Sequence, residues 1–250
     1  MKVIGTEAFA GNPMIAITLL GNVPPSLGAG ALPETVTEIV MSDEAIPVYS
    51  KHKDWKQYVG KLKPFSEAVG VLYKDRNGKT GFIAGSEVPE DALENSGSTI
   101  LSINGVAKIG ADGLIGTRAY DLLIPNTLTE VGGSGLNLSA QILEFEEGRV
   151  DTAFMVDSRP DANVVILPST MTELTGWVID NVPRVIVSKA VVPPTLGLWD
   201  AYTWNSNNIE YRTSLGSWYS YAGTGCEALY VPVESIEAYR NDPHWSMYTA

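Results

Sequence analysis

The side chains that most often carry out catalysis or hold metals are scarce in this chain. It contains two histidines, His52 and His244, and one cysteine, Cys226. A catalytic triad or a Cys–His pair needs a base held beside a nucleophile, and no nucleophile motif accompanies either histidine. Neither histidine has a further histidine, cysteine or glutamate at the spacing of a zinc site. We therefore expect no catalytic centre and no metal site, with both histidines facing solvent and Cys226 packed beside a strand.

Carboxylates offer a second route to chemistry. A pair of them can hydrolyse a glycosidic bond, but a solvated edge of a repeat is the simpler interpretation of the densest acidic group, which comprises Glu144, Glu146, Glu147 and Asp151. Asp75-x-Asn77-Gly78 begins like a calcium loop but lacks the acidic residue at the twelfth position. The glycine-rich residues 132–135 lack the Lys-Ser/Thr of a phosphate loop. The sequence therefore predicts no cofactor and no enzymatic activity.

Aromatic residues concentrate in one segment, residues 198–227. Large rigid rings next to amide side chains provide contact area for a protein or glycan ligand at low entropic cost. The alternative is that these rings pack as an enlarged hydrophobic plug at the end of the molecule. The candidate ligand-binding residues are Trp199, Tyr202, Trp204, Tyr211, Trp218 and Tyr219.

The elements that would position these residues recur along the chain. Residues 39–58 match residues 229–248 at a constant offset of 229 − 39 = 190, and residues 12–28 match residues 181–197 at an offset of 197 − 28 = 169. The offsets differ by 190 − 169 = 21, so an insertion of that length lies between Gly197 and Leu229. The chain therefore contains an internal duplication, and the aromatic segment is its insertion.

Short apolar strings give the period of the repeat. They begin at residues 122, 142, 164 and 184, so the intervals are 142 − 122 = 20, 164 − 142 = 22 and 184 − 164 = 20. Each string is too short for a helix. The pattern Pro-x-Thr-apolar-Thr-Glu-apolar occurs at residues 33–39, 125–131 and 168–174. This interval falls in the leucine-rich-repeat range. A unit with one strand cannot bury its own apolar face, so successive units must stack into a solenoid.

Each copy of the duplication ends in an aromatic segment with helical spacing. Pro232 suits a first helical turn, and Ile236 and Tyr239 share one face. A terminal capping element of this kind would cover the open end of the last repeat. The structural cap residues predicted in this way are Tyr49, Trp55 and Tyr58 in the first copy and Tyr239, Trp245 and Tyr248 in the second.

Four phrases resemble a known family: LIPNTLTEV, ILPSTMTEL, VIVSKAVVPPTLG and the ending ALYVPVESIEAYRNDPHWSMY. They look like the BspA-type leucine-rich repeats in surface proteins of gut Bacteroidetes and some eukaryotic parasites. The resemblance covers residues 118–250 well and residues 3–63 nearly as well, but not 64–117. It implies a mainly β, right-handed leucine-rich-repeat solenoid with short helices, in two segments that each end in a helical aromatic cap.

The expected organisation is a short capped repeat segment at residues 1–63, a β-hairpin connector or irregular repeats at 64–117, and a solenoid at 118–250 that carries the 198–227 insertion. Asn77-Gly78 between strand-like runs predicts the hairpin. The first segment has few repeats and no polar N-terminal cap. We expect its open face to be covered by the second solenoid, by another copy of the chain or by preceding residues.

Composition narrows the function. Seventeen basic and 29 acidic residues give a net charge of −12, which argues against a nucleic-acid partner. No apolar run is long enough to span a bilayer, and no signal peptide begins the chain. The resemblance implies an interaction or adhesion module that binds a protein or glycan at the cell surface. The alternative is a fibre or decoration component of the virion of a Bacteroidetes phage, acting as a homo-oligomer or in a larger assembly.

Overall fold

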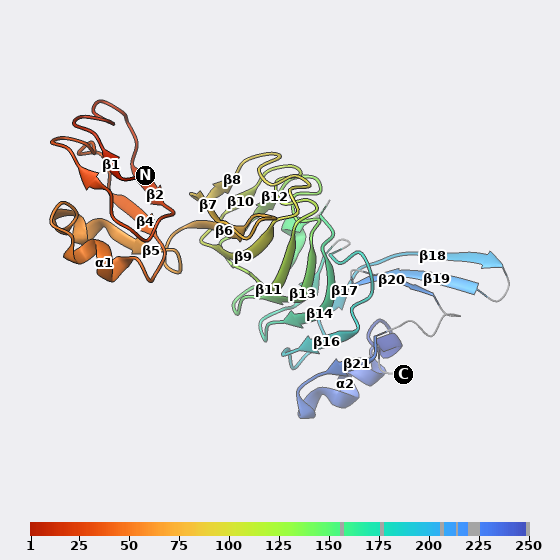
Figure 1. Cartoon of the computed structure of the whole chain (residues 1–250). Coiled ribbons are helices and arrows are strands. Elements are labelled where there is room, and N and C mark those ends of the chain that lie inside the picture. Colours follow the sequence, from red (N-terminus) through yellow and green to blue (C-terminus); the bar gives the residue numbers. More distant parts are fainter. Residues whose placement is uncertain (156–157, 176–177, 206–207, 214, 220–225, 249–250) are drawn as a thin grey trace.

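The computed structural model describes residues 1–155, 158–175, 178–205, 208–213, 215–219 and 226–248, and only the backbone of 198–205, 208–213 and 216–219. The chain is mainly β with few short helices, arranged as a β-solenoid of about nine turns (Figure 1). Successive strands lie side by side along the molecule, as stacking of one-strand units requires. The predicted solenoid architecture is therefore confirmed.

One large sheet runs through the second part of the chain. Its eight strands are ordered β21-β16-β14-β13-β11-β9-β6-β7, and those from β9 to β21 pair in parallel. The apolar strings at residues 122, 142, 164 and 184 lie in or at the edge of four consecutive strands, β11, β13, β14 and β16. The bounds are β6 (Gly70–Lys74), β7 (Thr80–Ala84), β9 (Thr99–Asn104), β11 (Arg118–Ile124), β13 (Ser139–Phe145), β14 (Asp161–Leu167), β16 (Val185–Ser188) and β21 (Ala228–Tyr230).

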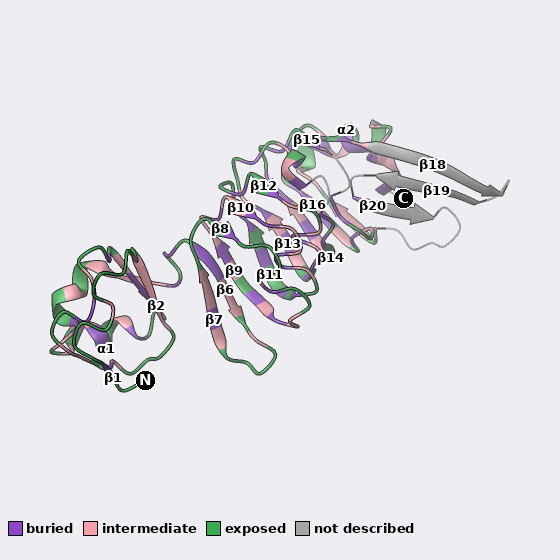
Figure 2. Cartoon of the chain, turned by 90° about the horizontal axis from the view of Figure 1, so that it is seen from above, coloured by how far each residue is buried: buried purple, intermediate pink, exposed green. Residues whose placement is uncertain are grey.

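Shorter strands on the opposite side of each coil close the core. They form one sheet of β8 (Glu87–Val88), β10 (Lys108–Ile109) and β12 (Glu130–Val131), and one of β15 (Glu173–Leu174) and β17 (Thr195–Leu196). In the long strands the inward positions are fully buried: Leu122, Leu143 and Val165 are 1%, 0% and 0% exposed. Figure 2 shows this alternation of buried and exposed residues across the coils. A 3-10 turn, η2 (Ala153–Met155), lies between β13 and β14.

The Pro-x-Thr-apolar-Thr-Glu pattern joins successive coils. Its first threonine hydroxyl donates to a carbonyl of the preceding coil, at 2.8 Å from Thr35, 2.9 Å from Thr127 and 2.8 Å from Thr170. The apolar residue between the threonines is buried in all three copies, at 0% to 2% exposure. The amide groups of the second threonine and the glutamate both donate to one carbonyl of the preceding coil. The sequence pattern therefore recurs because each copy makes the same hydrogen bonds to the preceding coil.

The N-terminal unit is built from the same parts. Its strands are β1 (Val3–Ile4), β2 (Ala16–Leu19), β3 (Ser26–Leu27), β4 (Glu38–Met41) and β5 (Leu62–Pro64), and its helices are α1 (Ile46–Lys51) and the 3-10 helix η1 (Lys56–Lys61). Strands β2, β4 and β5 form a parallel sheet, and β1 pairs with β3. A separate core that includes Val36, Ile39 and Met41 fills the space between them.

The two aromatic segments have matching surroundings. Trp55 and Trp245 are both 0% exposed, and each donates from Nε1 to a proline carbonyl, Pro25 or Pro194, at 2.7 Å. The ring of Tyr49 meets that of Trp55 at 5.0 Å and 73°, and the corresponding C-terminal pair meets at 5.1 Å and 74°. The C-terminal segment comprises η3 (Val233–Ser235), α2 (Ile236–Asn241) and η4 (Ser246–Tyr248). One packing arrangement therefore occurs twice.

The predicted hairpin at Asp75 to Gly78 is present. Strands β6 and β7 pair antiparallel, and the Asp75 carboxylate accepts from the amides of Asn77 at 2.8 Å and Lys79 at 2.9 Å. Strand β6 also pairs antiparallel with β9, which pairs in parallel with β11. Strands β6, β7 and β9 are therefore part of the large sheet.

Candidate functional site

The N-terminal sheet of β2, β4 and β5 and the large eight-stranded sheet meet through a small apolar cluster. Val40 of β4 and Phe65, which follows β5, are 2% and 5% exposed, and Leu72 of β6 and Phe82 of β7 pack against them. The rings of Phe65 and Phe82 lie 5.1 Å apart at 32°. In each unit these side chains belong to the face of the sheet that points away from its own core. The outward faces of the two sheets therefore converge at this cluster, which we call the junction cluster (Val40, Phe65, Ala68, Leu72, Phe82).

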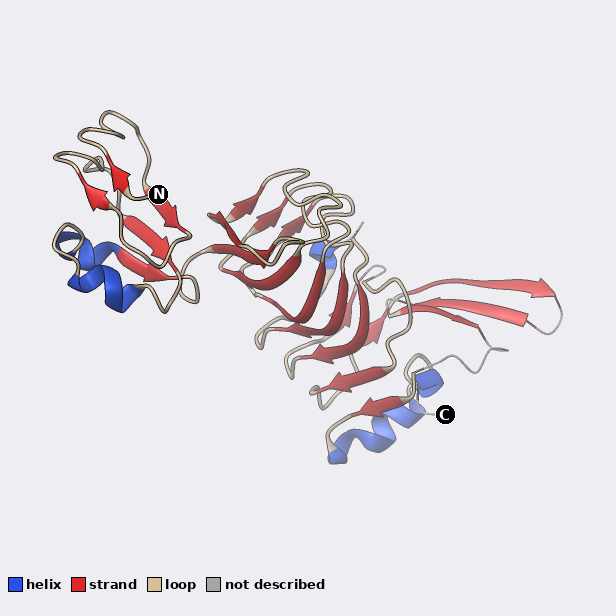
Figure 3. Cartoon of the chain, in the orientation of Figure 1, coloured by secondary structure: helices blue, strands red, loops and turns tan. Residues whose placement is uncertain are grey.

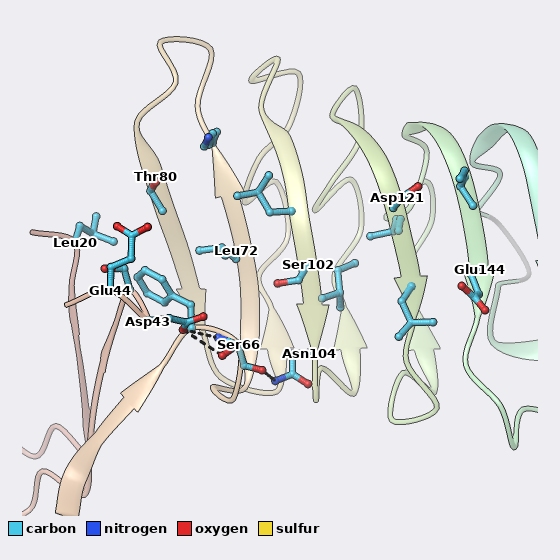
Figure 4. A pocket seen from close by; sticks show the side chains of 18 of the residues that line it. Leu20, Asp43, Glu44, Ser66, Leu72, Thr80, Ser102, Asn104, Asp121 and Glu144 are labelled. Carbon is cyan, nitrogen blue, oxygen red and sulfur yellow. Dashed lines mark hydrogen bonds between the residues drawn. The ribbon is translucent and has the colours of Figure 1, made fainter. Parts of the chain in front are cut away.

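Hydrogen bonds fix the chain at this junction. The Asn104 side-chain amide donates to the carbonyl oxygens of Ser66 at 3.3 Å and Ala68 at 3.0 Å. The Ser66 hydroxyl donates in turn to the Asp43 carboxylate at 3.1 Å (Figure 4). These contacts link the N-terminal unit and residues 66–68 to β9.

Beyond the junction cluster the faces diverge and enclose a groove of about 1200 Å³. Residues of the N-terminal unit line one wall, and residues on β6, β7, β9, β11, β13 and β14 line the floor and the other wall (Figure 4). Figure 3 shows the N-terminal unit beside the start of the large sheet. Strand alternation explains the lining, because the residues between the buried positions must face outward. The outward aliphatic side chains on the floor are Leu101, Leu123, Ile142 and Ile166.

Carboxylates dominate the charge of the groove. Its charged lining residues are Asp43, Glu44, Asp121 and Glu144 against Lys74, which gives 1 − 4 = −3. The Glu144 carboxylate is paired with the Lys189 ammonium at 2.9 Å, and this hydrogen bond raises the pKa of Lys189. Asp43 is held by Ser66. Glu44 and Asp121 are exposed, and their side-chain carboxylates form no ion pair or hydrogen bond with any residue that the structure describes.

The dense acidic group around β13 serves to connect coils. Glu147 accepts from the amide and the hydroxyl of Ser169 at 3.0 Å and 2.9 Å. Glu146 accepts from the amide of Asn126 at 2.7 Å, and Asp151 caps the turn at Ala153 at 3.0 Å. Across the described residues, no three His, Cys, Asp or Glu side chains are grouped so as to hold a metal ion.

The histidines lie at different places in the duplicated aromatic segments. Both are half-buried, so the expectation that they face solvent is only partly correct. His52 accepts the amide of Asp54 through Nδ1 at 3.3 Å, and at the equivalent place Asp242 accepts the amide of His244 at 2.8 Å. His52 corresponds to Asp242, and Asp54 corresponds to His244. In both copies the side chain at the first position accepts a hydrogen bond from the amide two residues later.

Cys226 is half-buried beside β21. Its thiol lies 3.0 Å from the carbonyl oxygen of Ala228, and burial raises its pKa. A thiol with a raised pKa is a poor nucleophile at neutral pH. This environment fits a packed side chain.

Sequence reasoning does not identify Arg149, the most buried charged residue in the described part of the chain. It is 9% exposed, and its Nη2 donates to the carbonyl oxygens of Pro125 at 2.7 Å and Leu128 at 2.8 Å. Its guanidinium lies 4.2 Å from the centre of the Phe154 ring. Burial lowers its pKa, while Asp151 and Glu146 oppose that shift. Arg149 joins neighbouring coils, and no periodic signal marks it.

The aromatic insertion forms a three-stranded antiparallel sheet of β18 (Leu198–Asn205), β19 (Asn208–Thr213) and β20 (Gly216–Tyr219). In Figure 1 these strands extend beyond the last coil of the solenoid. Tyr211 is the register partner of both Ala201 and Trp218. The side chains of the six predicted ligand-binding residues, Trp199, Tyr202, Trp204, Tyr211, Trp218 and Tyr219, lie outside the described part of the structure.

Comparisons with family models, with curated proteins and with solved structures find no match to this chain. No helix in the described part of the chain combines the length and the apolar character needed to cross a membrane.

Proposed function

We propose that this chain is a non-enzymatic interaction module that binds a partner in the groove between its two sheet faces. The observation that carries the proposal is the groove itself: a hollow of about 1200 Å³ with aliphatic side chains exposed on its floor. Leu101 and Leu123 are 41% and 45% exposed there. Concave surfaces of solenoids are suited to extended partners, and exposed apolar area within a groove is typical of binding sites.

The polypeptide is the better-supported class of ligand for this groove. Sugar rings bind mainly by stacking on aromatic side chains, and among the described residues that line the groove Phe65 is the only aromatic one. A glycan ligand would be bound through the 198–219 strands, where the tryptophans and tyrosines are concentrated. The resemblance to BspA-type leucine-rich repeats supports the same class of function, at a cell surface, with no cofactor.

The proposal is tested with labelled protein on arrays of defined peptides and glycans. We expect peptide binding that is lost in the double variant Leu101→Gln/Leu123→Gln and kept in the control Val191→Gln/Val192→Gln. The control residues are 53% and 76% exposed and lie away from the groove. A ligand whose binding is unchanged in the groove variant contradicts the proposal. A glycan ligand lost only on replacing Trp199, Trp204 and Trp218 by alanine assigns the function to the insertion instead.

One observation favours the second candidate, an assembly component of a virion. Strand β2 corresponds to β16, because residue 16 matches residue 185 at the offset of 185 − 16 = 169. Strand β16 has two partners in the sheet, β21 on one side and β14 on the other. In the part of the chain that the structure describes, no strand occupies the side of β2 that corresponds to the β14 side. Ile15, which directly precedes β2, is 67% exposed, and Val3, on β1 at the edge of the separate β1–β3 sheet, is 62% exposed. Light scattering tests it: an oligomer dispersed by Val3→Lys/Ile15→Lys supports assembly, and a monomer contradicts it.

A further inference from the structure

This inference rests on the proposed function. If the groove is a binding site, its acidic side chains and the aliphatic side chains on its floor indicate the class of partner. We propose that the groove takes an extended, cationic polypeptide segment, in which lysine or arginine side chains reach Glu44 on one wall and Asp121 on the other. The intervening aliphatic part of the segment lies on Leu101 and Leu123. The partner is therefore basic and partly apolar.

Two of the four carboxylates that line the groove lack a partner among the described residues. Glu144 is neutralised by Lys189 at 2.9 Å, and Asp43 is occupied by the Ser66 hydroxyl at 3.1 Å. Glu44 and Asp121 have no such partner among the described residues, and both are exposed toward the groove. A carboxylate that is already hydrated and unpaired can form a charge-assisted hydrogen bond without breaking an internal one. These two side chains are therefore the available anchors.

The two anchors come from different walls. Glu44 precedes α1 in the N-terminal unit, and Asp121 lies on β11 of the large sheet (Figure 4). Complementary charges on both walls would orient an incoming segment and speed its association. The whole chain reinforces this effect, since its net charge is −12. An acidic segment would be repelled by both.

The floor explains why the cations should be carried by long side chains. Leu101, Leu123 and Ile142 present aliphatic surface beside the carboxylates. Lysine and arginine bury their methylene stems along apolar surface while keeping the charged head at a polar rim. A groove with this combination therefore selects lysine and arginine over a small inorganic cation. No metal-binding group exists there among the described residues.

The test compares three labelled peptides of one length by fluorescence anisotropy on the full chain. In the first, lysine alternates with leucine and serine; in the second, glutamine replaces lysine; in the third, glutamate does. We expect the lysine peptide to bind and the glutamate peptide not to bind. Raising the ionic strength should weaken binding, because the contacts are partly exposed.

A pair of matched variants locates the effect. Glu44→Gln/Asp121→Asn removes two carboxylates from the groove, and Glu173→Gln/Glu234→Gln removes two exposed carboxylates elsewhere. We expect the groove variant to weaken lysine-peptide binding about tenfold and the control less than about twofold. Equal loss in both variants would show non-specific attraction and overturn the inference.

The remaining outcomes separate this inference from the proposed function. If the glutamine peptide binds as tightly as the lysine peptide and Leu101→Gln/Leu123→Gln abolishes both, the groove binds polypeptide and the cationic preference is wrong. If every peptide binds equally to wild type and to the leucine variant, the groove is not the site and the proposed function fails as well. If the protein binds a glycan and none of the peptides, the proposed function in the groove fails in the same way.

Discussion

Trp245 donates a hydrogen bond of 2.7 Å from its indole Nε1 to the carbonyl oxygen of Pro194, 51 residues earlier in the sequence. Trp55 makes the same bond to Pro25 across only 30 residues. The difference, 51 − 30 = 21, is the length of the insertion that the sequence offsets define. The insertion thus leaves the packing around the second tryptophan intact.

This equivalence predicts equal sensitivity at the two tryptophans. Trp55→Phe and Trp245→Phe each remove a buried donor and leave a proline carbonyl unpaired, so each should lower the free energy of unfolding by about 1–3 kcal/mol. Replacement of either by alanine should cost about 3–5 kcal/mol because it also leaves a cavity. Urea denaturation of the full chain measures both. Val233→Ala, at an 80% exposed site, is the control, and clearly unequal costs at Trp55 and Trp245 would contradict the equivalence.

The insertion itself should be removable. Replacing residues 198–227 by residues 29–37 of the first copy shortens the connection by 30 − 9 = 21, which is the length of the insertion. Strands β16 and β21 pair directly, and the graft supplies Ala31, Leu32 and Val36, which are buried in the first unit, in place of the buried Leu215. We expect a cooperatively folded protein with the Trp245 near-ultraviolet signal retained. Loss of that signal would show that the inserted strands are needed for the fold.

The threonine pattern predicts graded stability losses. The Thr170 hydroxyl donates to the Arg149 carbonyl at 2.8 Å and accepts from the Gly148 amide at 2.9 Å, whereas the Thr129 hydroxyl makes one longer contact of 3.4 Å. Thr170→Val should therefore cost about 1–2 kcal/mol and Thr129→Val under about 0.5 kcal/mol. Thermal and urea unfolding give the comparison. An equal cost at both positions would mean that the coil-to-coil hydrogen bonds contribute little.

The buried tyrosines predict a loss of stability in alkali. Burial raises the pKa of Tyr239 above its ordinary value, despite the opposing hydrogen bond with Ser188. The folded state then binds more protons than the unfolded state above about pH 10, so the free energy of unfolding falls as the pH rises through that range. Tyr239→Phe should be less stable at neutral pH but have a shallower alkaline decline. Identical declines in the variant and wild type would show that this phenol does not contribute.

Much of the fold is predictable from sequence because it is periodic. The strings at residues 122, 142, 164 and 184 mark four neighbouring strands, and the matched offsets place Trp55 and Trp245 in the same surroundings. The two-residue strand β8 is not predictable, because so short an element in a polar, turn-rich stretch leaves no alternation to detect.

The groove is not predictable from the same signals. Its lining comes from residues 20–166, and its two walls meet at single contacts such as Phe65 with Phe82 and Asn104 with Ser66. No repeat encodes these contacts, because they occur where the repeat is interrupted. Sequence reasoning instead selected the aromatic segment, where residue type alone gives a signal.

The most direct test of the account is amide hydrogen exchange of the full chain, with and without the ligand that binds best on the arrays. Binding in the groove predicts slower exchange at residues 42–44, 101–104 and 121–123, which come from both walls and the floor. Protection confined to residues 198–219, or to residues 15–19, would contradict it and assign binding to the insertion or to the open edge of β2.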